Sequence, residues 1–340
     1  MAFFDKPLDE LQTYWPEVNE PSDFEDFWRA TIAEARKHDL DVRREKVDSP
    51  LANVEIHDIT FAGYGGHDIR AWLYLPVGAS GPLPTVLEYH GYSGGRGMPL
   101  NTLWASAGYA HLSMDTRGQG WSQASDRPRT LDPEAGGGQP GTMTQGIDDK
   151  DSYFYRRVFT DAFRLLEVAR EIDEVDTDKI FVRGGSQGGG ITIAVAGLAG
   201  LLDVPLAGAT PDVPFLCHFD RAITLTDAYP YKEISDHLKG RPGEVEQVLT
   251  TLGYHDGVNF ARRASCPTLF SVALMDQICP PSTVYAAFNA WGDPDQQINV
   301  YSHNGHEGGR EVQTWAQLVW MKERLEAPRG RKRPRRGLRR

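Results

Sequence analysis

The chain has 340 residues, 40% hydrophobic and 24% charged, a composition typical of globular proteins and unlike that of disordered or collagenous chains. Its 36 basic and 47 acidic residues give a net charge of −11. Eight of the basic residues lie in the segment 327–340, so the rest of the chain carries 28 basic and 47 acidic residues, a net charge of −19. A body this acidic excludes a nucleic-acid-binding core, because phosphate binding needs a basic face.

The segment 327–340 is predicted to be a disordered basic tail, because it has almost no apolar residues to bury. The three cysteines, Cys217, Cys266 and Cys279, have no paired spacing, and the acidic N-terminal sequence lacks the pattern of a secretory signal. The longest apolar stretch, 191–202, is shorter than the roughly 20 residues that cross a bilayer. We therefore expect a cytoplasmic protein with reduced thiols that binds neither membranes nor nucleic acid.

Residues 1–40 are predicted to form an N-terminal helical extension. Ser22 or Asp23 is a suitable N-cap for the helix that begins with FEDFWRATIAEARK. Two β-like runs follow, VEIHDITFAG and DIRAWLYLP, and the turn residues Tyr64-Gly65-Gly66-His67 separate them. This arrangement is typical of an antiparallel hairpin.

From Thr85 onward, short apolar strands alternate with helical segments. The predicted strands are TVLEYHG, YAHLSMD, KIFVRGG, PTLFSVALMD and QINVYSH. The predicted helices are 100–107, YFYRRVFTDAFRLLEVAREI, QGGGITIAVAGLAGLL, STVYAAFNAW and 311–326. Apolar strands between helices predict a mostly parallel, doubly wound sheet covered on both faces. The fold class is therefore α/β, as a single domain over residues 1–326.

Two insertions interrupt this alternation. Residues 116–150 form a long loop that contains Gly136-Gly137-Gly138, and residues 213–260 hold several short helices between two strands. In α/β sheets, excursions at the carboxyl ends of strands usually shape the binding site.

The most informative segment is Gly184-Gly185-Ser186-Gln187-Gly188, which fits the pattern G-x-S-x-G between a strand and a helix. The glycines allow a sharp turn that exposes the serine hydroxyl above the sheet. The N-terminus of the following helix would lie beneath a developing oxyanion. The glycine spacing does not match a dinucleotide fingerprint, and no lysine stands where a Walker loop needs one. Ser186 is therefore the predicted nucleophile.

A serine nucleophile needs a base and an orienting carboxylate, in the chain order serine, acid, histidine for this kind of fold. Asp276 ends the strand PTLFSVALMD, and His306 follows the strand QINVYSH in a glycine-containing loop. We favour this pair; the alternatives are His303 for the base and Asp293 or Asp295 for the acid.

No metal or cofactor is expected. The histidines at 303 and 306 lack the H-E-x-x-H spacing of a zinc helix and an evident third ligand. Acyl transfer also requires hydrogen-bond donors for the oxyanion. The backbone N–H of Gln187 and that of Tyr92, in the segment after TVLEYHG, are the predicted pair.

Together these segments resemble the acetyl xylan esterase and cephalosporin C deacetylase family, the seventh carbohydrate esterase family, over nearly all of residues 1–326. The matching motifs are HGYSGGRG, MDTRGQG, GGGQPGTMTQGI, GGSQGGG, VPFLCHF, PYKEI, CPPSTVYAAFN and GHEGG. The resemblance implies an α/β-hydrolase fold with an antiparallel N-terminal hairpin and helical insertions. It also implies a triad of Ser186, Asp276 and His306, an oxyanion hole at Tyr92 and Gln187, and substrate binding by Tyr92 and Pro230.

The activity implied by the resemblance is that of a serine esterase. Such an enzyme removes acetyl groups from short acetylated xylo-oligosaccharides, cephalosporin C and related small esters through an acetyl-enzyme, as a cytoplasmic homohexamer without cofactors. Arg117, in Arg117-Gly118-Gln119, is expected to anchor loops around the site. Leu100 and the basic tail depart from the family pattern.

Two other functions share parts of this pattern. A peptidase of the prolyl oligopeptidase type would share the serine motif and the order of the triad, but nothing resembles its propeller. A non-catalytic α/β-hydrolase acting as a binding protein would normally lack one triad member, and all three are present.

Overall fold

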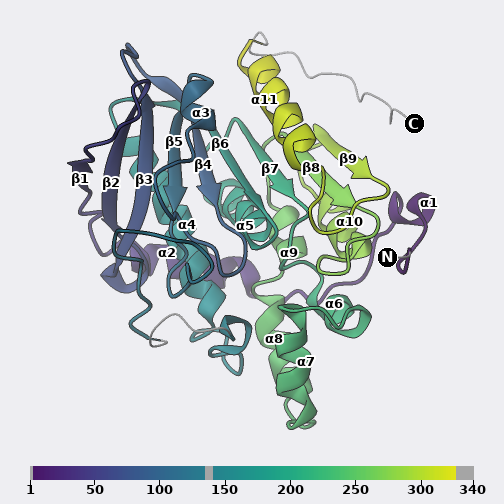
Figure 1. The fold of residues 1–340 in the computed structure, drawn as a ribbon. Helices are drawn as coiled ribbons and strands as arrows, with labels where there is room; N and C mark the ends of the chain where they lie inside the picture. Colours follow the sequence, from purple (N-terminus) through teal and green to yellow (C-terminus); the bar gives the residue numbers. More distant parts are fainter. Residues whose placement is uncertain (1–2, 135–140, 327–340) are drawn as a thin grey trace.

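The computed structural model describes residues 3–134 and 141–326. Within these residues, nine strands form one sheet in the order β1-β2-β3-β5-β4-β6-β7-β8-β9 (Figure 1). The first three strands pair antiparallel, β3 pairs antiparallel with β5, and β4 to β9 run parallel. The strands are β1 (Arg43–Lys46), β2 (Val54–Ala62), β3 (Asp68–Pro76), β4 (Leu83–Tyr89), β5 (Ala110–Met114), β6 (Val175–Gly185), β7 (Gly208–Asp212), β8 (Thr268–Ala273) and β9 (Gln296–Tyr301).

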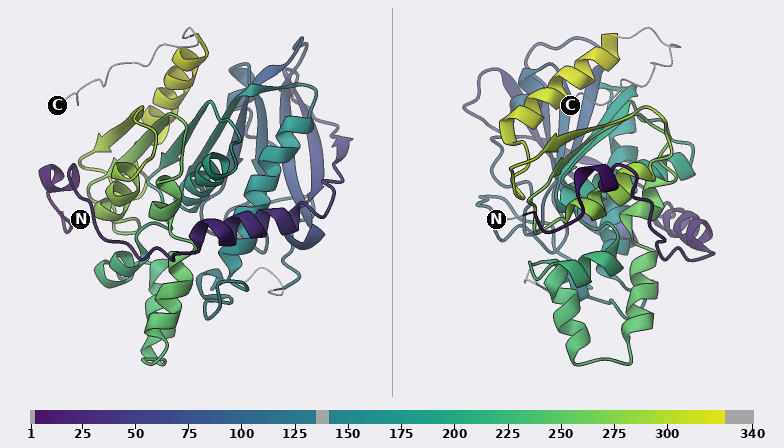
Figure 2. Two further views of the ribbon diagram at one scale, coloured as in Figure 1. Left: turned by 180° about the vertical axis from the view of Figure 1, so that it is seen from behind. Right: turned by 90° about the vertical axis from the view of Figure 1, so that its right-hand side faces the viewer.

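Helices cover both faces of the sheet. Seen from behind, α2, α4, α5 and α10 lie against one face, and α3 and α11 lie on the other (Figures 1 and 2). The helices are α1 (Leu8–Leu11), α2 (Phe24–Ala35), α3 (Leu103–Ser106), α4 (Phe154–Glu171), α5 (Gln187–Leu201), α6 (Phe219–Leu225), α7 (Tyr231–Lys239), α8 (Val245–Gly253), α9 (Gly257–Ala261), α10 (Pro281–Asn289) and α11 (Arg310–Glu326), with single turns η1 (Tyr64–Gly66) and η2 (Thr142–Thr144).

This architecture confirms the predicted fold class. The predicted hairpin is β2–β3, with residue pairs from Val54↔Pro76 to Ala62↔Asp68. The edge strand β1 was not predicted, because its sequence RREK is charged and exposed and has no apolar pattern. The glycines at 136–138 and the predicted tail 327–340 lie outside the described residues. No helix in the described part of the chain is long and apolar enough to cross a membrane.

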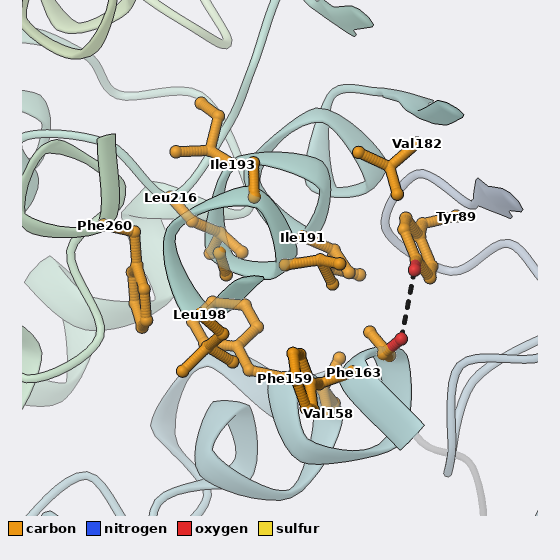
Figure 3. Packing of buried hydrophobic residues seen from close by; sticks show 14 of the residues in the cluster. Tyr89, Val158, Phe159, Phe163, Val182, Ile191, Ile193, Leu198, Leu216 and Phe260 are labelled. Carbon is orange, nitrogen blue, oxygen red and sulfur yellow. Dashed lines mark hydrogen bonds between the residues drawn. The ribbon is translucent and has the colours of Figure 1, made fainter. Parts of the chain in front are cut away.

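The helix α5 lies at the centre of the main core. It is apolar on all sides, and nearly every residue in it is buried. Leu198 lies near Phe260 of α9 and Phe159 of α4, and all three side chains are buried (Figure 3). The hydroxyl of Tyr89, at the end of β4, donates to the carbonyl of Ala162 in α4 at 3.0 Å. Dense packing of this kind fixes the N-terminus of α5, where Ser186 is located.

The two insertions meet at the carboxyl edge of the sheet. The segment after β7 forms α6 to α9, of which α7 and α8 project away from the sheet (Figure 1). The segment after β5 is held by Arg117, whose buried guanidinium donates to both carboxylate oxygens of Asp161 at 2.6 and 2.7 Å. The backbone N–H of Tyr64 donates to the same carboxylate at 2.8 Å. Arg117 therefore ties the loop to α4 and to the hairpin, as expected of an anchor.

A buried histidine makes the stability of this fold sensitive to acid. His255 lies among aromatic rings, 4.9 Å from Tyr153 and 5.6 Å from Trp28 by ring centroids. Its Nδ1 donates to the carbonyl of Thr251 at 2.9 Å, and its buried Nε2 has no hydrogen-bond partner among the described residues. Burial lowers the pKa of His255 to about 3.

We expect the free energy of unfolding to fall as the pH drops below about 6.5, because the unfolded chain then binds a proton that folded His255 excludes. The loss from this residue between pH 7 and pH 5.5 is on the order of 1 kcal/mol. Urea unfolding at pH 7 and pH 5.5 measures it. His255→Phe should be less stable at pH 7 but should lose less stability on acidification. An equal loss in both proteins would contradict the role of His255.

Candidate active site

Ser186 occupies a strained turn between β6 and α5. Its φ of 57° and ψ of −122° are unfavourable for a residue with a side chain. Two hydrogen bonds hold the turn: the N–H of Ser186 donates to the carbonyl of Asp212 at 2.9 Å, and its carbonyl accepts from the N–H of Phe215 at 2.9 Å. Glycine is required at position 188, two residues after Ser186, because a Cβ there would lie 2.1 Å from the carbonyl oxygen of Tyr89.

Of the three residues predicted as a triad, His306 is in contact with both of the others. Nε2 of His306 lies 2.9 Å from Oγ of Ser186, and its Nδ1 lies 2.9 Å from Oδ2 of Asp276. A carboxylate only accepts hydrogen bonds, so Nδ1 donates and Nε2 is left to accept from the serine hydroxyl. The other oxygen of Asp276 accepts the N–H groups of Ile278 and Cys279 at 2.8 and 2.9 Å. The Asp276 side chain is only 1% exposed, so these contacts fix its orientation.

The alternative triad members lie elsewhere. His303 is exposed, and its ring meets that of Phe3 edge-on at 6.2 Å. Asp295 forms an ion pair with Arg324 of α11 at 2.9 Å. Neither residue is in contact with Ser186, so the geometry favours His306 and Asp276.

The loop that carries His306 is anchored on both sides. Oε1 of Gln313, in α11, accepts from the hydroxyl of Tyr301 and from the amide of Asn299, both at 2.9 Å. Nε2 of Gln313 donates to Asp212 at 2.9 Å. A Cβ at Gly309 would lie 2.0 Å from the ring of Tyr301, so only glycine allows this close packing. The sequence did not predict this role of Gln313, because no pattern in the neighbouring residues distinguishes it from any other glutamine in a helix.

The segment predicted to carry the oxyanion donors lies beside the serine. A Cβ at Gly91 would lie 3.9 Å from Cβ of Ser186, so the segment with Tyr92 passes next to the nucleophile. Gln187 is the first residue of α5, directly after Ser186. Both backbone segments are therefore next to the nucleophile, as donors for an oxyanion must be.

Gln119 links these two segments. The side-chain amides of Gln119 and Gln187 exchange two hydrogen bonds, both of 3.0 Å. Oε1 of Gln119 also accepts the N–H of Ser93 at 3.1 Å, and Nε2 of Gln187 donates to the carbonyl of His90 at 3.2 Å. The Arg117-Gly118-Gln119 motif thus has two roles, of which sequence reasoning assigned only the anchoring by Arg117.

Tyr92 and Pro230 are joined through α7. The hydroxyl of Tyr92 donates to Oε1 of Glu233 at 2.7 Å and accepts the N–H of Thr142 at 3.1 Å. The other oxygen of Glu233 accepts the N–H of Met143 at 3.2 Å. Burial raises the pKa of Tyr92 to about 12 and raises the pKa of Glu233. Buried Pro230 immediately precedes α7, the helix that carries Glu233.

A cavity of about 420 Å³ opens beside Ser186 and His306. Tyr92 and Pro230, the predicted substrate contacts, are not among its lining residues. Its lining combines polar and apolar surface and consists of Gly185, Ser186, Asp212, Val213, Ser271, His306, Glu307, Gly308, Gly309, Arg310, Glu311, Gln313 and Thr314.

Two groups of described residues place three possible metal ligands within 4.8 Å of one another. The first is Asp276, Cys279 and His306, where the carboxylate and imidazole are used in hydrogen bonds. Burial raises the pKa of the Cys279 thiol well above its usual range, which disfavours the thiolate that binds metals. This donor set suits a catalytic triad better than a metal centre.

The second group is Asp148, His237 and Glu244, which join α7 and α8 to the loop after β5. Nε2 of His237 lies 3.6 Å from Asp148 and 3.8 Å from Glu244. The guanidinium of Arg241 lies 3.5 Å from the same Glu244 oxygen. That cation compensates the carboxylates, and it would repel a metal ion at this position.

Comparisons with known proteins show the family of the chain. Residues 1–324 match the family model described as acetyl xylan esterase (AXE1). Acetyl esterase Axe7A of Xylanibacter ruminicola is 28% identical over 317 residues, which cover 92% of this chain and 69% of that protein.

Solved structures give the same result. The acetyl xylan esterase from Paenibacillus sp. R4 has a TM-score of 0.86 and 39% identity, covering 94% of this chain and 99% of that chain. Acetyl xylan esterase 1 from Thermoanaerobacterium sp. has a TM-score of 0.84 and 32% identity over the same shares. A prolyl endopeptidase structure, at 18% identity and a TM-score of 0.59, shares the fold alone, and the match covers 40% of its chain.

The family model spans nearly the whole chain, and two solved esterases share its fold at more than 30% identity. The chain therefore belongs to the acetyl xylan esterase (AXE1) family and is a carboxylic ester hydrolase.

Proposed function

We propose that this chain is a serine esterase that removes acetyl groups from short acetylated xylo-oligosaccharides and related small esters, including cephalosporin C. The observation that carries the proposal is the position of His306, 2.9 Å from both Ser186 and Asp276. Membership of the acetyl xylan esterase family supports the acetyl group as the acyl part of the substrate.

The proposed mechanism follows from these contacts. His306 removes the proton of Ser186 as the hydroxyl oxygen attacks the acetyl carbonyl. The backbone N–H groups of Tyr92 and Gln187 donate to the oxyanion, and the N-terminus of α5 adds a favourable dipole. His306 then gives the proton to the leaving sugar oxygen. Water repeats the sequence on the acetyl-enzyme and releases acetate. Asp276 holds the imidazole in the required tautomer throughout.

We also propose that the protein is cytoplasmic and forms a homohexamer, with no nucleic-acid or membrane partner. The three cysteines are free and buried, which is compatible with a reducing compartment. One face of α11 exposes Val312, Trp315 and Val319, whose spacing forms an apolar stripe, and Trp315 is 70% exposed. Such a stripe suits contact with another copy of the chain.

The decisive test of the chemistry is an ester panel with two variants. Acetyl esters should be hydrolysed faster than butyrate or octanoate esters, with 4-nitrophenyl esters, acetylated xylobiose and cephalosporin C as substrates. Ser186→Ala should lower kcat by the order of 10⁶ and Asp276→Asn by about 10⁴. Circular dichroism checks that both variants fold. Full activity of Ser186→Ala would refute the nucleophile, and inactivity of the unmodified protein on every ester would favour the peptidase or binding-protein alternative.

Gln119 tests the proposed oxyanion hole. In Gln119→Leu, the link between Ser93 and Gln187 is lost, so the two donors are no longer held at a fixed separation. We expect kcat for 4-nitrophenyl acetate to fall by about 10², close to the loss of one oxyanion donor, with KM nearly unchanged. Gln123→Leu is the matched control, because exposed Gln123 contacts Gly95 in the same loop but not Gln187. Equal effects of the two variants would count against the positioning role.

Sedimentation velocity tests the assembly. The unmodified protein should sediment as a hexamer, and Trp315→Glu should shift it toward smaller species, because a charge cannot be buried cheaply in an apolar contact. A monomer at micromolar concentration of the unmodified protein would exclude the proposed assembly.

A further inference from the structure

Tyr92, a predicted oxyanion donor, is held in two separate places. Next to its backbone, the N–H of Ser93 donates to Oε1 of Gln119 at 3.1 Å. At the far end of its side chain, the Tyr92 hydroxyl donates to Oε1 of Glu233 at 2.7 Å. The two restraints come from different parts of the chain, the loop after β5 and the helical insertion after β7. The helix α7 therefore reaches the oxyanion segment independently of Gln119.

The Tyr92 hydroxyl is fully hydrogen-bonded. Besides donating to Glu233, it accepts the backbone N–H groups of Gly141 and Thr142 at 3.2 and 3.1 Å. The second oxygen of Glu233 accepts the N–H of Met143 at 3.2 Å. The hydroxyl and the carboxylate together satisfy three consecutive backbone donors, so the side chain of Tyr92 can move only if several of these bonds break.

The turn that contains these donors also contacts the residue that carries the second predicted oxyanion donor. The hydroxyl of Tyr155, in α4, lies 3.2 Å from Sδ of Met143 and 2.8 Å from Oε1 of Gln187. Tyr155 is fully buried, so these contacts are protected from water. The position that Glu233 gives to the turn therefore bears on Tyr92 directly and on Gln187 through Tyr155.

The partners of Glu233 call for a carboxylate at this position. The Tyr92 hydroxyl and the Met143 N–H are both donors here, and a carboxylate offers one acceptor oxygen to each. A glutamine has the same shape but only one acceptor oxygen, so its NH₂ group would face a donor whichever way the amide is turned. A buried donor without an acceptor is unfavourable, so the contact would open.

We propose that Glu233 is a positioning residue for ester cleavage, which acts through the Tyr92 hydroxyl to hold the backbone N–H of Tyr92 toward the oxyanion. In the described part of the chain, Glu233 hydrogen-bonds to Tyr92 and Met143 and does not line the cavity beside Ser186. Bonds to an oxyanion strengthen as its charge develops, so misplacing a donor lowers kcat more than it weakens binding. The proposal rests on the esterase function proposed above.

Glu233→Gln tests this role. We expect kcat for 4-nitrophenyl acetate at about pH 8 to fall about tenfold, with KM changed by less than about twofold. The loss is smaller than that of a whole oxyanion donor, because the N–H of Tyr92 is displaced and not removed. Circular dichroism checks that the variant folds. An unchanged kcat would overturn the proposal.

Glu246→Gln is the matched control. Glu246 is an exposed glutamate of α8, in the same insertion, and its side chain has no hydrogen bond or ion pair among the described residues. The same loss of charge should therefore leave kcat and KM unchanged. A loss equal to that of Glu233→Gln would attribute the effect to the charge of the insertion and would contradict the proposal.

A double-mutant cycle tests whether Glu233 acts through Tyr92. Tyr92→Phe removes the hydroxyl but keeps the ring and the backbone N–H, and it should lower kcat by about the same factor as Glu233→Gln. The double variant should lie within about twofold of the slower single variant, because both substitutions break the same link. If the two losses multiply, the residues act separately and the proposal is wrong.

Glu233 is the group in its surroundings that can change its charge near neutral pH. The titratable groups that face it are Tyr92, Tyr153 and Tyr155. Burial raises the pKa of Tyr92 to about 12 and the pKa values of the other two tyrosines well above their usual range, so all three stay neutral. On α7 itself, Lys232 and Asp236 pair with each other at 3.3 Å. Burial also raises the pKa of Glu233.

The pH dependence therefore separates positioning from a merely structural role. As the pH falls through its raised pKa, the Glu233 carboxylate gains a proton and resembles the glutamine of the variant. The ratio of kcat for the unmodified protein to kcat for Glu233→Gln should be largest above that pKa and approach one below it. Titration of His306 affects both proteins and cancels in the ratio. A constant ratio between about pH 8 and about pH 4.5 would contradict the proposal.

The same measurements distinguish failure of this proposal from failure of the esterase function. If the unmodified protein hydrolyses acetyl esters and Glu233→Gln keeps full kcat, only the positioning role is wrong. If the unmodified protein hydrolyses no ester, the esterase function fails and the positioning role fails with it.

Discussion

The rest of the site depends on one interaction, the bridge that His306 makes between Ser186 and Asp276. Ser186 and His306 are 120 positions apart in the sequence, and each follows the carboxyl end of a parallel strand. The bridge can form only if β6, β8 and β9 end at the same edge in register. Strand pairing supplies that register, from Phe181↔Gly208 to Ala273↔Tyr301. The apolar sheet core and the polar site are therefore parts of a single constraint.

Around this bridge, polar side chains fix loops that have no regular structure of their own. Gln119 holds the backbone beside Tyr92 against Gln187, and Gln313 holds the loop of His306 against β7 and β9. Glu233 fixes the inserted helix α7 in the same way, because its carboxylate accepts hydrogen bonds from the hydroxyl of Tyr92 and from the backbone N–H of Met143. Buried polar groups of this kind cost free energy unless every partner is present, so they specify one arrangement of the loops.

A feature of this molecule can be predicted from the sequence when the residues that define it lie close together in the chain. The serine turn was predictable because G-x-S-x-G, a preceding strand and a following helix are all local. Asp276 and His306 could be located because strand ends are visible as the end of an apolar run. The strand β1 could not be predicted, because its sequence RREK has no apolar pattern. The helix expected at 100–107 is shorter and spans only Leu103–Ser106. Gln119, Glu233 and Gln313 could not be assigned, because their partners are far away in the sequence.

The two sides of Ser186 differ in a way that follows from this organisation. On one side, hydrogen bonds of Gln119 join the Tyr92 segment to Gln187, so the relative position of these two segments is fixed. On the other side, the loop after His306 leads into α11 and leaves a cavity. Fixed backbone on one side and open space on the other are what the proposed ester cleavage requires, because the oxyanion donors must keep their positions while the leaving alcohol needs room.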